Sequence, residues 1–398
     1  MMLISRDTEL YLLGGARTPF GTYGGSLRNV DAVTLGSIAA REALERSGIP
    51  ASAIDFSVVG GVIPSIPDFA YLARHVALQA GVPVESDSLT VNRLCGSGLQ
   101  AVISAAQSLM LGDGEVALAG GTENMSQSPF ALRGSRWGIK NRPPELDDTL
   151  QSTLTDLGCG LGMGMTAENL AERYQISRDE QDELAQLSHS RAHEAQLQGI
   201  LAEEIVPVPV RVKDQIQSVE NDEHIRPGTT GETLARLKPV FKEHGTVTAG
   251  NSSGINDGAA MVVVATGDFV RAHGLKPMAR IVSYGVAGVD PTVMGFGPVP
   301  ASLKALERAG LDIEEVGRVE INEAFAAQYL AVEQQLRLDR SITNVHGGAI
   351  ALGHPVGASG SRLLLTMMYE LRRSSVHYGL VSLCIGGGQG VSMVIETV

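Results

Sequence analysis

The stretch Ala43-Leu-Glu-Arg-Ser-Gly-Ile49 occurs again 262 residues later as Ala305-Leu-Glu-Arg-Ala-Gly-Leu311. In both copies a glycine ends an amphipathic segment, which is typical of a helix with a left-handed C-terminal cap. An apolar strand is predicted after each copy, at Phe56-Ser-Val-Val-Gly60 and at Arg318-Val-Glu-Ile-Asn322. The repeat therefore predicts a chain made of two related halves.

The same offset of 262 residues relates two glycine-rich turns. Cys95-Gly-Ser-Gly98 in the first half corresponds to Gly357-Ala-Ser-Gly360 in the second, and a helix-like segment follows each turn. Each half then has an apolar strand that ends in glycines, at Val116–Gly121 and at Gly379–Gly388. We predict an α/β fold with two mixed-sheet halves of similar topology.

A segment of different character lies between the halves, at about residues 125–254. It contains charged helical stretches and few strand signals, and Ser177-Arg-Asp-Glu180 is a capping box that opens one of its helices. We interpret the segment as an insertion that forms a loop-rich lid or substrate-binding subdomain. The predicted organisation is a first half at 1–124 plus 255–276, the insertion at 125–254, and a second half at 277–398.

The composition limits the class of protein and its compartment. With 398 residues, 43% hydrophobic and 19% charged, the chain is long enough for two or three domains. Its net charge of −13 argues against a nucleic-acid partner. Its longest apolar runs, such as Met261–Ala265, are much shorter than the roughly 20 residues that span a membrane. Three cysteines without a disulfide framework, and an N-terminus without an apolar or Arg-rich targeting segment, predict a cytoplasmic protein.

Three glycine-rich turns carry the residues best suited to chemistry, namely Cys95, His354 and Cys384. Cys95 lies between a predicted strand and a predicted helix, where the helix dipole is expected to lower the thiol pKa from about 8.5 toward neutrality. His354 stands in a turn with little side-chain packing, as expected for a base or a donor. Glycines follow Cys384, and their N–H groups offer an oxyanion site. Taken singly, each residue is also compatible with a buried structural role.

Asn322-Glu-Ala-Phe325 is predicted to begin a helix directly after a strand. Its side-chain amide has two interpretations that the sequence leaves open. It is either a helix N-cap or a group that fixes a water molecule or a carbonyl oxygen.

Two other kinds of site compete with this chemistry. Gly158-Cys-Gly-Leu-Gly-Met-Gly-Met165 resembles a dinucleotide-binding loop in composition, but no buried strand is predicted before it. Cys95, Cys384, His354 and His346 are zinc ligands by type, but no Cys-x-x-Cys or His-x-x-x-His pair occurs among them. We therefore expect neither a dinucleotide nor a metal ion.

Motifs spread over nearly the whole chain read Arg17-Thr-Pro-Phe-Gly21, Asn92-Arg-Leu-Cys-Gly-Ser-Gly98, Gly120-Gly-Thr-Glu-Asn-Met-Ser126, Gly245-Thr-Val-Thr-Ala-Gly-Asn-Ser-Ser-Gly254, Asn322-Glu-Ala-Phe-Ala326, Gly347-Gly-Ala-Ile-Ala-Leu-Gly-His-Pro355 and Cys384-Ile-Gly-Gly-Gly-Gln-Gly390. Together they resemble the thiolase family. Tyr71-Leu-Ala-Arg-His-Val76 and Met294-Gly-Phe-Gly-Pro-Val-Pro300 are most similar to the mitochondrial type of 3-ketoacyl-CoA thiolase within it. The resemblance implies a duplicated fold whose two halves pack as a layered αβαβα core.

The resemblance also implies a role for each reactive side chain. Cys95 would be the acylated nucleophile, and His354 would accept its proton. Cys384 would remove the α-proton of acetyl-CoA in condensation or protonate the carbanion in cleavage. One oxyanion site would come from His354 and a water held by Asn322, and the other from the N–H groups of Cys95 and Gly386.

By the same resemblance, the insertion would bind coenzyme A as a substrate, with no permanently bound cofactor. The residues that match substrate-binding positions are Arg226 and Thr233 near the nucleotide, Leu154, Phe241, Ala249 and Ser253 along the pantetheine, and Met163 and Phe325 beside them. The expected partners are acyl-CoA molecules and further copies of the chain. Pairing of sheets would form a homodimer, and the loop insertion would allow a homotetramer.

Two departures from the family pattern bear on specificity. Short-chain biosynthetic members have a histidine where this chain has Gly162, which favours broader acyl chains. His346 replaces the usual asparagine before Gly347 and is expected to add a titratable group near the site. The predicted function is a thiolase of fatty-acid β-oxidation, transferring an acyl group between coenzyme A and acetyl-CoA. The alternatives are an acyl-CoA thioesterase and a non-catalytic lipid carrier on the same fold.

Overall fold

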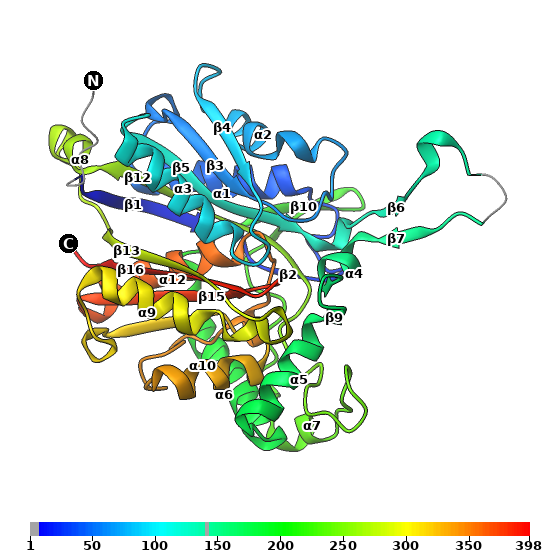
Figure 1. The fold of residues 1–398 in the computed structure, drawn as a ribbon. Coiled ribbons are helices and arrows are strands. Elements are labelled where there is room, and N and C mark those ends of the chain that lie inside the picture. The colour runs from blue at the N-terminus through cyan, green and yellow to red at the C-terminus, as the bar shows by residue number, and fades with distance from the viewer. Residues whose placement is uncertain (1–7, 140–142) are drawn as a thin grey trace.

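One large mixed sheet forms the centre of the molecule (Figure 1). The computed structural model describes residues 8–139 and 143–398. The N-terminal segment Met1–Asp7, which supported the predicted cytoplasmic location, lies outside the described residues. The strand order is β14-β15-β16-β13-β1-β12-β5-β3-β4, and β2 pairs with β12. The strands are β1 (Leu10–Arg17), β2 (Gly21–Thr22), β3 (Phe56–Gly60), β4 (Asp87–Val91), β5 (Val116–Asn124), β12 (Asn256–Thr266), β13 (Ala279–Gly288), β14 (Arg318–Ile321), β15 (Tyr378–Ile385) and β16 (Gln389–Glu396).

The sheet divides at β1 and β13 into the two predicted halves. β3 runs parallel to β4 and β5 in the first half, and β14 runs parallel to β15 in the second; the other pairs are antiparallel. β1 and β13 share only the pairs Tyr11↔Arg280 and Leu12↔Ala279, so the halves meet along a short seam. The α-helices of the halves are α1 (Ala32–Ser47), α2 (Leu72–Gln79), α3 (Ser97–Leu111), α8 (Gly267–His273), α9 (Pro298–Ala309), α10 (Ala326–Leu336), α11 (Ala349–Leu352) and α12 (Ser359–Ser374).

The hydrophobic core has three parts, which define five layers. Residues of α3 and α12 form the central part together with the inward faces of both halves of the sheet. α1 and α2 cover the outer face of the first half, and α9 and α10 cover the outer face of the second. The predicted αβαβα core is confirmed.

The repeat in the sequence is a repeat in the structure. Gly48 and Gly310, 262 residues apart, end α1 and α9 in left-handed conformations with φ of 68° and 69°. α3 and α12 begin at Ser97 and Ser359, which are separated by the same interval. Glycine is favoured at such caps because it has no Cβ to clash.

The N-terminal ends of the two central helices lie against each other. A Cβ at Gly98 would lie 2.7 Å from the backbone nitrogen of Ser361, and a Cβ at Gly360 would lie 2.4 Å from that of Leu99. Real Cβ atoms are not found this close to backbone, so the crossing depends on the two glycines. It brings the Cys95 turn and the His354 turn together.

The segment Leu94–Leu111, which contains α3, has a mean hydropathy of 1.3 over 18 residues. By length and composition this segment could cross a membrane, although each uninterrupted apolar run within it is much shorter than a membrane span. In the fold it is the central helix, with Leu99, Val102 and Ile103 buried between α12 and the sheet. An apolar composition is also typical of a helix surrounded by core.

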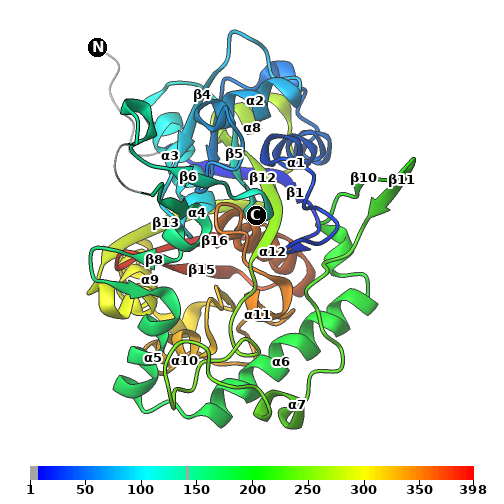
Figure 2. The ribbon, with the colours of Figure 1, turned by 90° about the vertical axis from the view of Figure 1, so that its right-hand side faces the viewer.

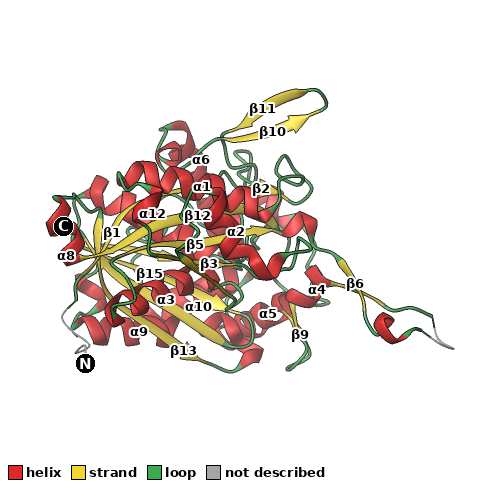
Figure 3. Cartoon of the chain, turned by 90° about the horizontal axis from the view of Figure 1, so that it is seen from above, coloured by secondary structure: helices red, strands yellow, loops and turns green. Residues whose placement is uncertain are grey.

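The chain between β5 and β12 forms hairpins and helices beside the halves. Its elements are β6 (Phe130–Leu132), β7 (Leu146–Asp148), α4 (Thr149–Thr153), β8 (Thr155–Asp156), β9 (Leu161–Gly162), α5 (Met163–Tyr174), α6 (Arg178–Leu197), β10 (Val208–Val212), β11 (Gln215–Val219) and α7 (Gly231–Ala235). The predicted capping box at Ser177 opens α6. The β6–β7 and β10–β11 hairpins project from the body of the molecule (Figure 3). α5, α6 and α7 lie beside the second half (Figure 2).

Short 3₁₀ turns complete the described secondary structure. They are Ala51–Ala53, Phe69–Tyr71, Met125–Gln127, Ser135–Trp137, Leu201–Glu203, Pro291–Phe296 and Ile313–Glu315.

Candidate active site

Cys95 lies in a tight turn between β4 and α3. The residue before it, Leu94, has a φ of +47°, which is unusual for a side chain that is not glycine. Ser97 holds the turn, because its hydroxyl donates to the Leu94 carbonyl at 2.6 Å and accepts the Arg93 N–H at 2.9 Å. The backbone N–H groups of Cys95 and Gly386 lie near the Cys95 sulfur and favour its ionised form. The thiol therefore faces a pair of donors from two distant parts of the chain.

The predicted lowering of the Cys95 pKa is wrong. Burial raises the pKa of this thiol to about 11, and the nearby Glu123 carboxylate raises it further. The two N–H donors act in the opposite direction but are outweighed. Cys95 packs with Leu94 and Leu154 against an apolar cluster, which explains the cost of ionisation. At neutral pH the resting group is a thiol, so a nucleophilic sulfur needs a proton acceptor.

His354 follows α11 and is 6% exposed. Its Nδ1 lies 2.5 Å from the Ser359 hydroxyl oxygen, and its Nε2 lies 3.4 Å from the Asn322 side-chain nitrogen. Its backbone N–H donates to Asn256 at 3.0 Å. Burial lowers the pKa of the imidazole to about 3, and the Arg362 guanidinium acts in the same direction. The histidine is therefore neutral at rest and able to accept a proton.

Asn322 lies between β14 and α10. The prediction that a helix begins at Asn322 is wrong, because Phe325 is extended, with a φ of −145°, and α10 begins at Ala326. The Asn322 N–H instead continues the sheet by donating to Ser382 at 2.9 Å. Its side-chain oxygen is buried and has no hydrogen-bond partner among the residues that the structure describes. This leaves the interpretation in which the amide fixes a small group beside His354.

Cys384 is fully buried near the end of β15, opposite Gly390 of β16. Burial raises its pKa well above the usual range, and the closeness of Cys95 raises it further. Its apolar neighbours include Met163 and Phe325. The structure thus brings together all the residues that were predicted to be catalytic: two protonated thiols, a neutral imidazole, the Asn322 carboxamide and the Gly386 N–H.

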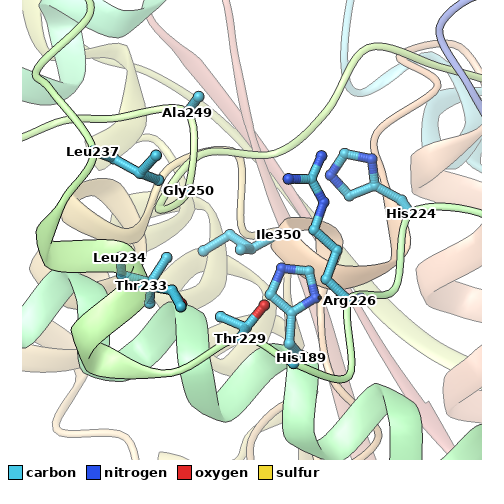
Figure 4. Close-up of a pocket in the computed structure, with 11 residues that line it drawn as sticks. His189, His224, Arg226, Thr229, Thr233, Leu234, Leu237, Ala249, Gly250 and Ile350 are labelled. Carbon is cyan, nitrogen blue, oxygen red and sulfur yellow. Dashed lines mark hydrogen bonds between the residues drawn. The ribbon is translucent and has the colours of Figure 1, made fainter.

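The residues expected at the nucleotide end of coenzyme A line a separate cavity of about 250 Å³. Arg226, Thr233 and Ala249 all face it (Figure 4). His189 and His224 line the same cavity and were not predicted, because isolated histidines give no sequence signal. The rings stack 6.5 Å apart, and burial and the Arg226 charge lower both pKa values to about 4. The cavity therefore combines one permanent cation with two neutral imidazoles.

The other residues expected to bind substrate pack near the thiols or contact the residues around them. Phe241 meets Phe325 edge to face, with ring centroids 6.0 Å apart. Met163 and Phe325 pack beside Cys384, whereas Leu154 packs in the cluster around Cys95. Ser253 donates its N–H to the Ala324 carbonyl at 2.9 Å, in the segment that carries Asn322.

Both parts of the chain match family models. Residues 10–268 match the thiolase N-terminal domain, and residues 275–397 match the thiolase C-terminal domain. The chain belongs to the thiolase family. It is 50% identical to the mitochondrial 3-ketoacyl-CoA thiolase of Rattus norvegicus over 97% of this chain and 98% of that protein. It is 45% identical to an acetyl-CoA acetyltransferase of Syntrophomonas wolfei over 98% and 99%.

A solved structure gives the same result. The human mitochondrial 3-ketoacyl-CoA thiolase in complex with CoA superimposes with a TM-score of 0.96 and 47% identity, covering 98% of each chain. The duplicated α/β architecture predicted from the repeat is therefore the thiolase fold. As a thiolase, the protein is an acyltransferase, and its family works on CoA substrates without a permanently bound cofactor.

His346 of this thiolase does not lie beside His354, contrary to expectation. Its Nε2 contacts Glu370 at 2.7 Å, near the C-terminal end of α12. His354 contacts Ser359 at the other end of the same helix, so the two imidazoles are separated by about 16 Å of helix length. Arg318 and Arg373 also bind Glu370, which makes His346 part of a network of polar contacts around a buried carboxylate.

The thiolase site has a buried carboxylate that the sequence analysis did not single out. Glu123, at the end of β5, accepts the N–H groups of Val62 and Ile63 at 3.1 Å each and that of Gly357 at 3.0 Å. It therefore ties the His354 turn to the loop after β3, beside Cys95. A glutamate directly after Gly120-Gly-Thr, within an apolar strand, was the available signal.

Proposed function

We propose that the enzyme catalyses the reversible reaction 3-ketoacyl-CoA + CoA = acyl-CoA + acetyl-CoA through an acyl group on Cys95. The observation that carries the proposal is the second thiol, Cys384, which lies close to Cys95 and two residues after Ser382, the backbone partner of Asn322. Acyl transfer needs one nucleophile, whereas breaking a carbon–carbon bond also needs an acid for the departing carbon. The two thiols supply these two functions.

In the first half-reaction, Cys95 transfers its proton to His354, and the thiolate attacks the 3-keto carbon. The bond between C2 and C3 breaks, and its electron pair remains on C2 as the enolate of acetyl-CoA. Cys384 then donates its proton to C2. Acetyl-CoA leaves, and the enzyme holds acyl-Cys95, protonated His354 and a thiolate at Cys384.

In the second half-reaction, coenzyme A gives its thiol proton to the Cys384 thiolate, and its sulfur attacks the acyl carbon. Cys95 leaves as a thiolate and recovers its proton from His354, which restores the starting state. The N–H groups of Cys95 and Gly386, which lie near the Cys95 sulfur, would stabilise the acyl oxygen as it becomes negative. The unpartnered Asn322 oxygen supports a bound water at the second oxyanion site, since an unsatisfied buried acceptor costs roughly 1–3 kcal/mol.

Alanine variants of the three cysteines test the mechanism. Cys95→Ala should abolish both cleavage and the acyl-enzyme seen by intact mass after incubation with acetyl-CoA. Cys384→Ala should still be acylated but should lose roughly 10²- to 10⁴-fold in 3-ketoacyl-CoA cleavage, because the carbon acid is gone. The matched control is Cys159→Ala, which removes a thiol that donates to the Asp156 carbonyl at 3.7 Å and should have wild-type activity.

Two outcomes would contradict the proposal. Hydrolysis of acyl-CoA that survives in Cys384→Ala, in the absence of cleavage by the wild type, would indicate a thioesterase. A wild-type protein that binds acetyl-CoA without any covalent mass increase would indicate a carrier.

We further propose that the enzyme accepts chains longer than acetoacetyl and acts in fatty-acid β-oxidation. The space at Gly162 supports this, because a Cβ there would have no neighbour closer than the Leu154 carbonyl oxygen at 3.8 Å. With φ of −70° and ψ of 153°, the position tolerates a side chain. Gly162→His should lower kcat/KM for 3-ketodecanoyl-CoA by roughly tenfold or more and change that for acetoacetyl-CoA little. An unchanged chain-length profile would contradict the proposal.

We propose a homotetramer that is built from sheet-paired dimers. The support for the dimer is strand β4, which pairs only with β3 among the described strands and exposes Leu89. The support for the tetramer is the projecting β6–β7 hairpin, which exposes Phe130, Trp137 and Leu146. In sedimentation equilibrium, Phe130→Asp/Leu146→Asp should give dimers where the wild type gives tetramers. Tetramers that persist in this variant would contradict the role of the hairpin.

We propose the cytoplasm as the compartment. Cys95, Cys159 and Cys384 are all free thiols, and the first and last of them need a reducing environment to act. Fractionation of source cells with an antibody against the protein should recover it with soluble cytoplasmic markers. Recovery with an organelle or an oxidising compartment would contradict this.

A further inference from the structure

The two central helices begin with serines that hold equivalent turns. Ser97 and Ser359 are 262 residues apart, and each is the first residue of its helix. The Ser97 hydroxyl donates to the Leu94 carbonyl and accepts the Arg93 N–H. The Ser359 hydroxyl donates to the Pro355 carbonyl at 2.8 Å and contacts the His354 ring at 2.5 Å. One serine therefore orders the nucleophile turn, and the other orders the histidine turn.

The second contact fixes which atom carries the proton. A carbonyl oxygen can only accept, so the single hydroxyl proton of Ser359 is used in the bond to Pro355. The Ser359 oxygen then faces His354 Nδ1 with a lone pair, and the ring nitrogen must be the donor at this distance. The result is a chain in which Nδ1–H donates to the hydroxyl and the hydroxyl donates to the carbonyl, each bond polarising the next.

This tautomer has a direct chemical consequence. When Nδ1 carries the proton of a neutral imidazole, Nε2 has the free lone pair. Nε2 faces the Asn322 side-chain nitrogen at 3.4 Å, and as the free nitrogen of the ring it is the one able to accept the Cys95 proton. The opposite tautomer would present an N–H there and would not be a base.

The partner of Nδ1 is also notable for being neutral. A carboxylate at this place would orient the ring and raise its basicity, as in serine hydrolases. A hydroxyl orients the ring without adding charge, and burial and Arg362 keep the imidazole unprotonated until a proton arrives from Cys95. A thiol is more acidic than a serine hydroxyl even when burial raises its pKa to about 11, so it needs a weaker base than a serine nucleophile does.

We propose that Ser359 is a positioning residue that holds His354 in the Nδ1–H tautomer and so makes Nε2 the proton acceptor of the reaction. The proposal rests on the role of His354 given under the proposed function. It assigns to Ser359 no contact with substrate. The role belongs to the hydroxyl, because an alanine at this position removes both the acceptor for Nδ1–H and the bond to the Pro355 carbonyl.

Ser361 provides a matched control on the same turn of α12. Its hydroxyl is also buried and also bonds backward to a carbonyl, that of Ala358 at 2.9 Å, but it is not bonded to the imidazole. Ser359→Ala should lower kcat roughly 10- to 100-fold, part of the 10²- to 10⁴-fold that a positioned base contributes, with KM for coenzyme A within twofold of wild type. Ser361→Ala should keep kcat within about twofold.

The tautomer itself is read by solid-state NMR of protein with ¹³C,¹⁵N-labelled histidine. The His354 signals are identified by their loss in His354→Gln, and correlations to the ring carbons show which nitrogen is protonated. Wild type and Ser361→Ala should show Nδ1–H, and Ser359→Ala should shift toward Nε2–H.

An Nε2–H tautomer in the wild type would overturn the proposal, as would an undiminished kcat in Ser359→Ala. The wild-type spectrum shows which nitrogen of His354 is protonated, so it tests the proposal even if Ser359→Ala does not fold. It also separates this proposal from the proposed function, because it needs no turnover. Full activity in Cys95→Ala would refute the mechanism and leave the tautomer as measured.

Discussion

The backbone N–H groups of Cys95 and Gly386 favour a thiolate at Cys95, yet burial and the Glu123 carboxylate keep it a thiol. A resting thiol reacts slowly with alkylating and oxidising agents, since the thiolate is the reactive form. The proton leaves only when His354 takes it. The donors that would stabilise a thiolate thus remain available for the oxygen of the substrate.

Glu123 allows this balance to be tested. Above its pKa of about 8, Glu123 carries a negative charge beside Cys95; Glu123→Gln removes this charge, which should lower the thiol pKa and speed alkylation by iodoacetamide at pH 9. The same change removes one acceptor from the three N–H groups that tie the Gly357 turn, so kcat should fall. Reactivity and turnover should therefore change in opposite directions. A parallel decrease of both would contradict the electrostatic role.

Glu168→Gln is the matched control for this pair of measurements. Glu168 is also a buried carboxylate that accepts backbone N–H groups, those of Thr246 and Val247. Neither contact is to the Cys95 or His354 turn. Its substitution should leave the alkylation rate unchanged.

For single residues, the sequence was sufficient to identify the candidate site residues but not to predict the surroundings that determine their pKa values. Cys95, His354, Cys384, Asn322 and Gly386 were named from motifs, and the structure brings them together. The thiol pKa was predicted in the wrong direction because a helix terminus can be recognised in a sequence, whereas the apolar packing that opposes it comes from distant segments. Ser359 was missed as a functional group for a similar reason: its partner is known only once the histidine ring is placed.

The crossing of α3 and α12 is the element on which the site depends. Gly360→Ala would place a methyl group 2.4 Å from the Leu99 backbone nitrogen, so one helix must shift. We expect a loss of about 1–3 kcal/mol in the free energy of unfolding, together with lower kcat, as the two turns move apart. Chemical denaturation and cleavage assays measure both.

Gly228→Ala is the control for stability, because nothing lies within 4 Å of a Cβ at that position. It should change the free energy of unfolding by less than about 0.5 kcal/mol. Equal stability of the Gly360 and Gly228 variants would contradict the importance of the crossing.

The helix boundaries of the two halves could be predicted because the repeat shows the same sequence pattern twice, once in each half. The caps at Gly48 and Gly310 and the starts of α3 and α12 follow from it. The seam between β1 and β13 could not be predicted, since it rests on two residue pairs that form only after both halves have folded. The hairpins β6–β7 and β10–β11 were missed, because short exposed strands lack the apolar alternation that marks a strand in a core.

For the whole molecule, the buried histidines predict how stability depends on pH. The pKa values of His189 and His224 are lowered from 6.5 to about 4, and that of His354 to about 3. At pH values between these folded-state pKa values and 6.5, the unfolded chain binds more protons than the folded chain. The contribution of the three histidines to the free energy of unfolding is therefore full above pH 6.5 and is lost as the pH falls toward 4. His189→Gln/His224→Gln should therefore show a smaller decrease in Tm from pH 6.5 to 4.5 than the wild type.

Buried carboxyl groups with raised pKa values, such as Glu123 with a pKa of about 8, have the opposite effect on the pH dependence of stability. Because these groups are the same in the variant and the wild type, their effect cancels when the two proteins are compared. Tm is measured by differential scanning calorimetry at each pH. Parallel curves would show that these imidazoles are not desolvated in the folded state.

The dependence of α3 on α12 has a consequence for synthesis. The apolar segment Leu94–Leu111 leaves the ribosome long before the helix that covers it, because α12 begins 262 residues after α3. At translation rates of roughly 5–20 residues per second, the delay is on the order of 13 to 50 seconds. During that interval the nascent first half exposes an uncovered apolar helix face, which is the kind of surface that chaperones bind. The two halves thus share a central core that is completed only when α12 has been synthesised, late in translation.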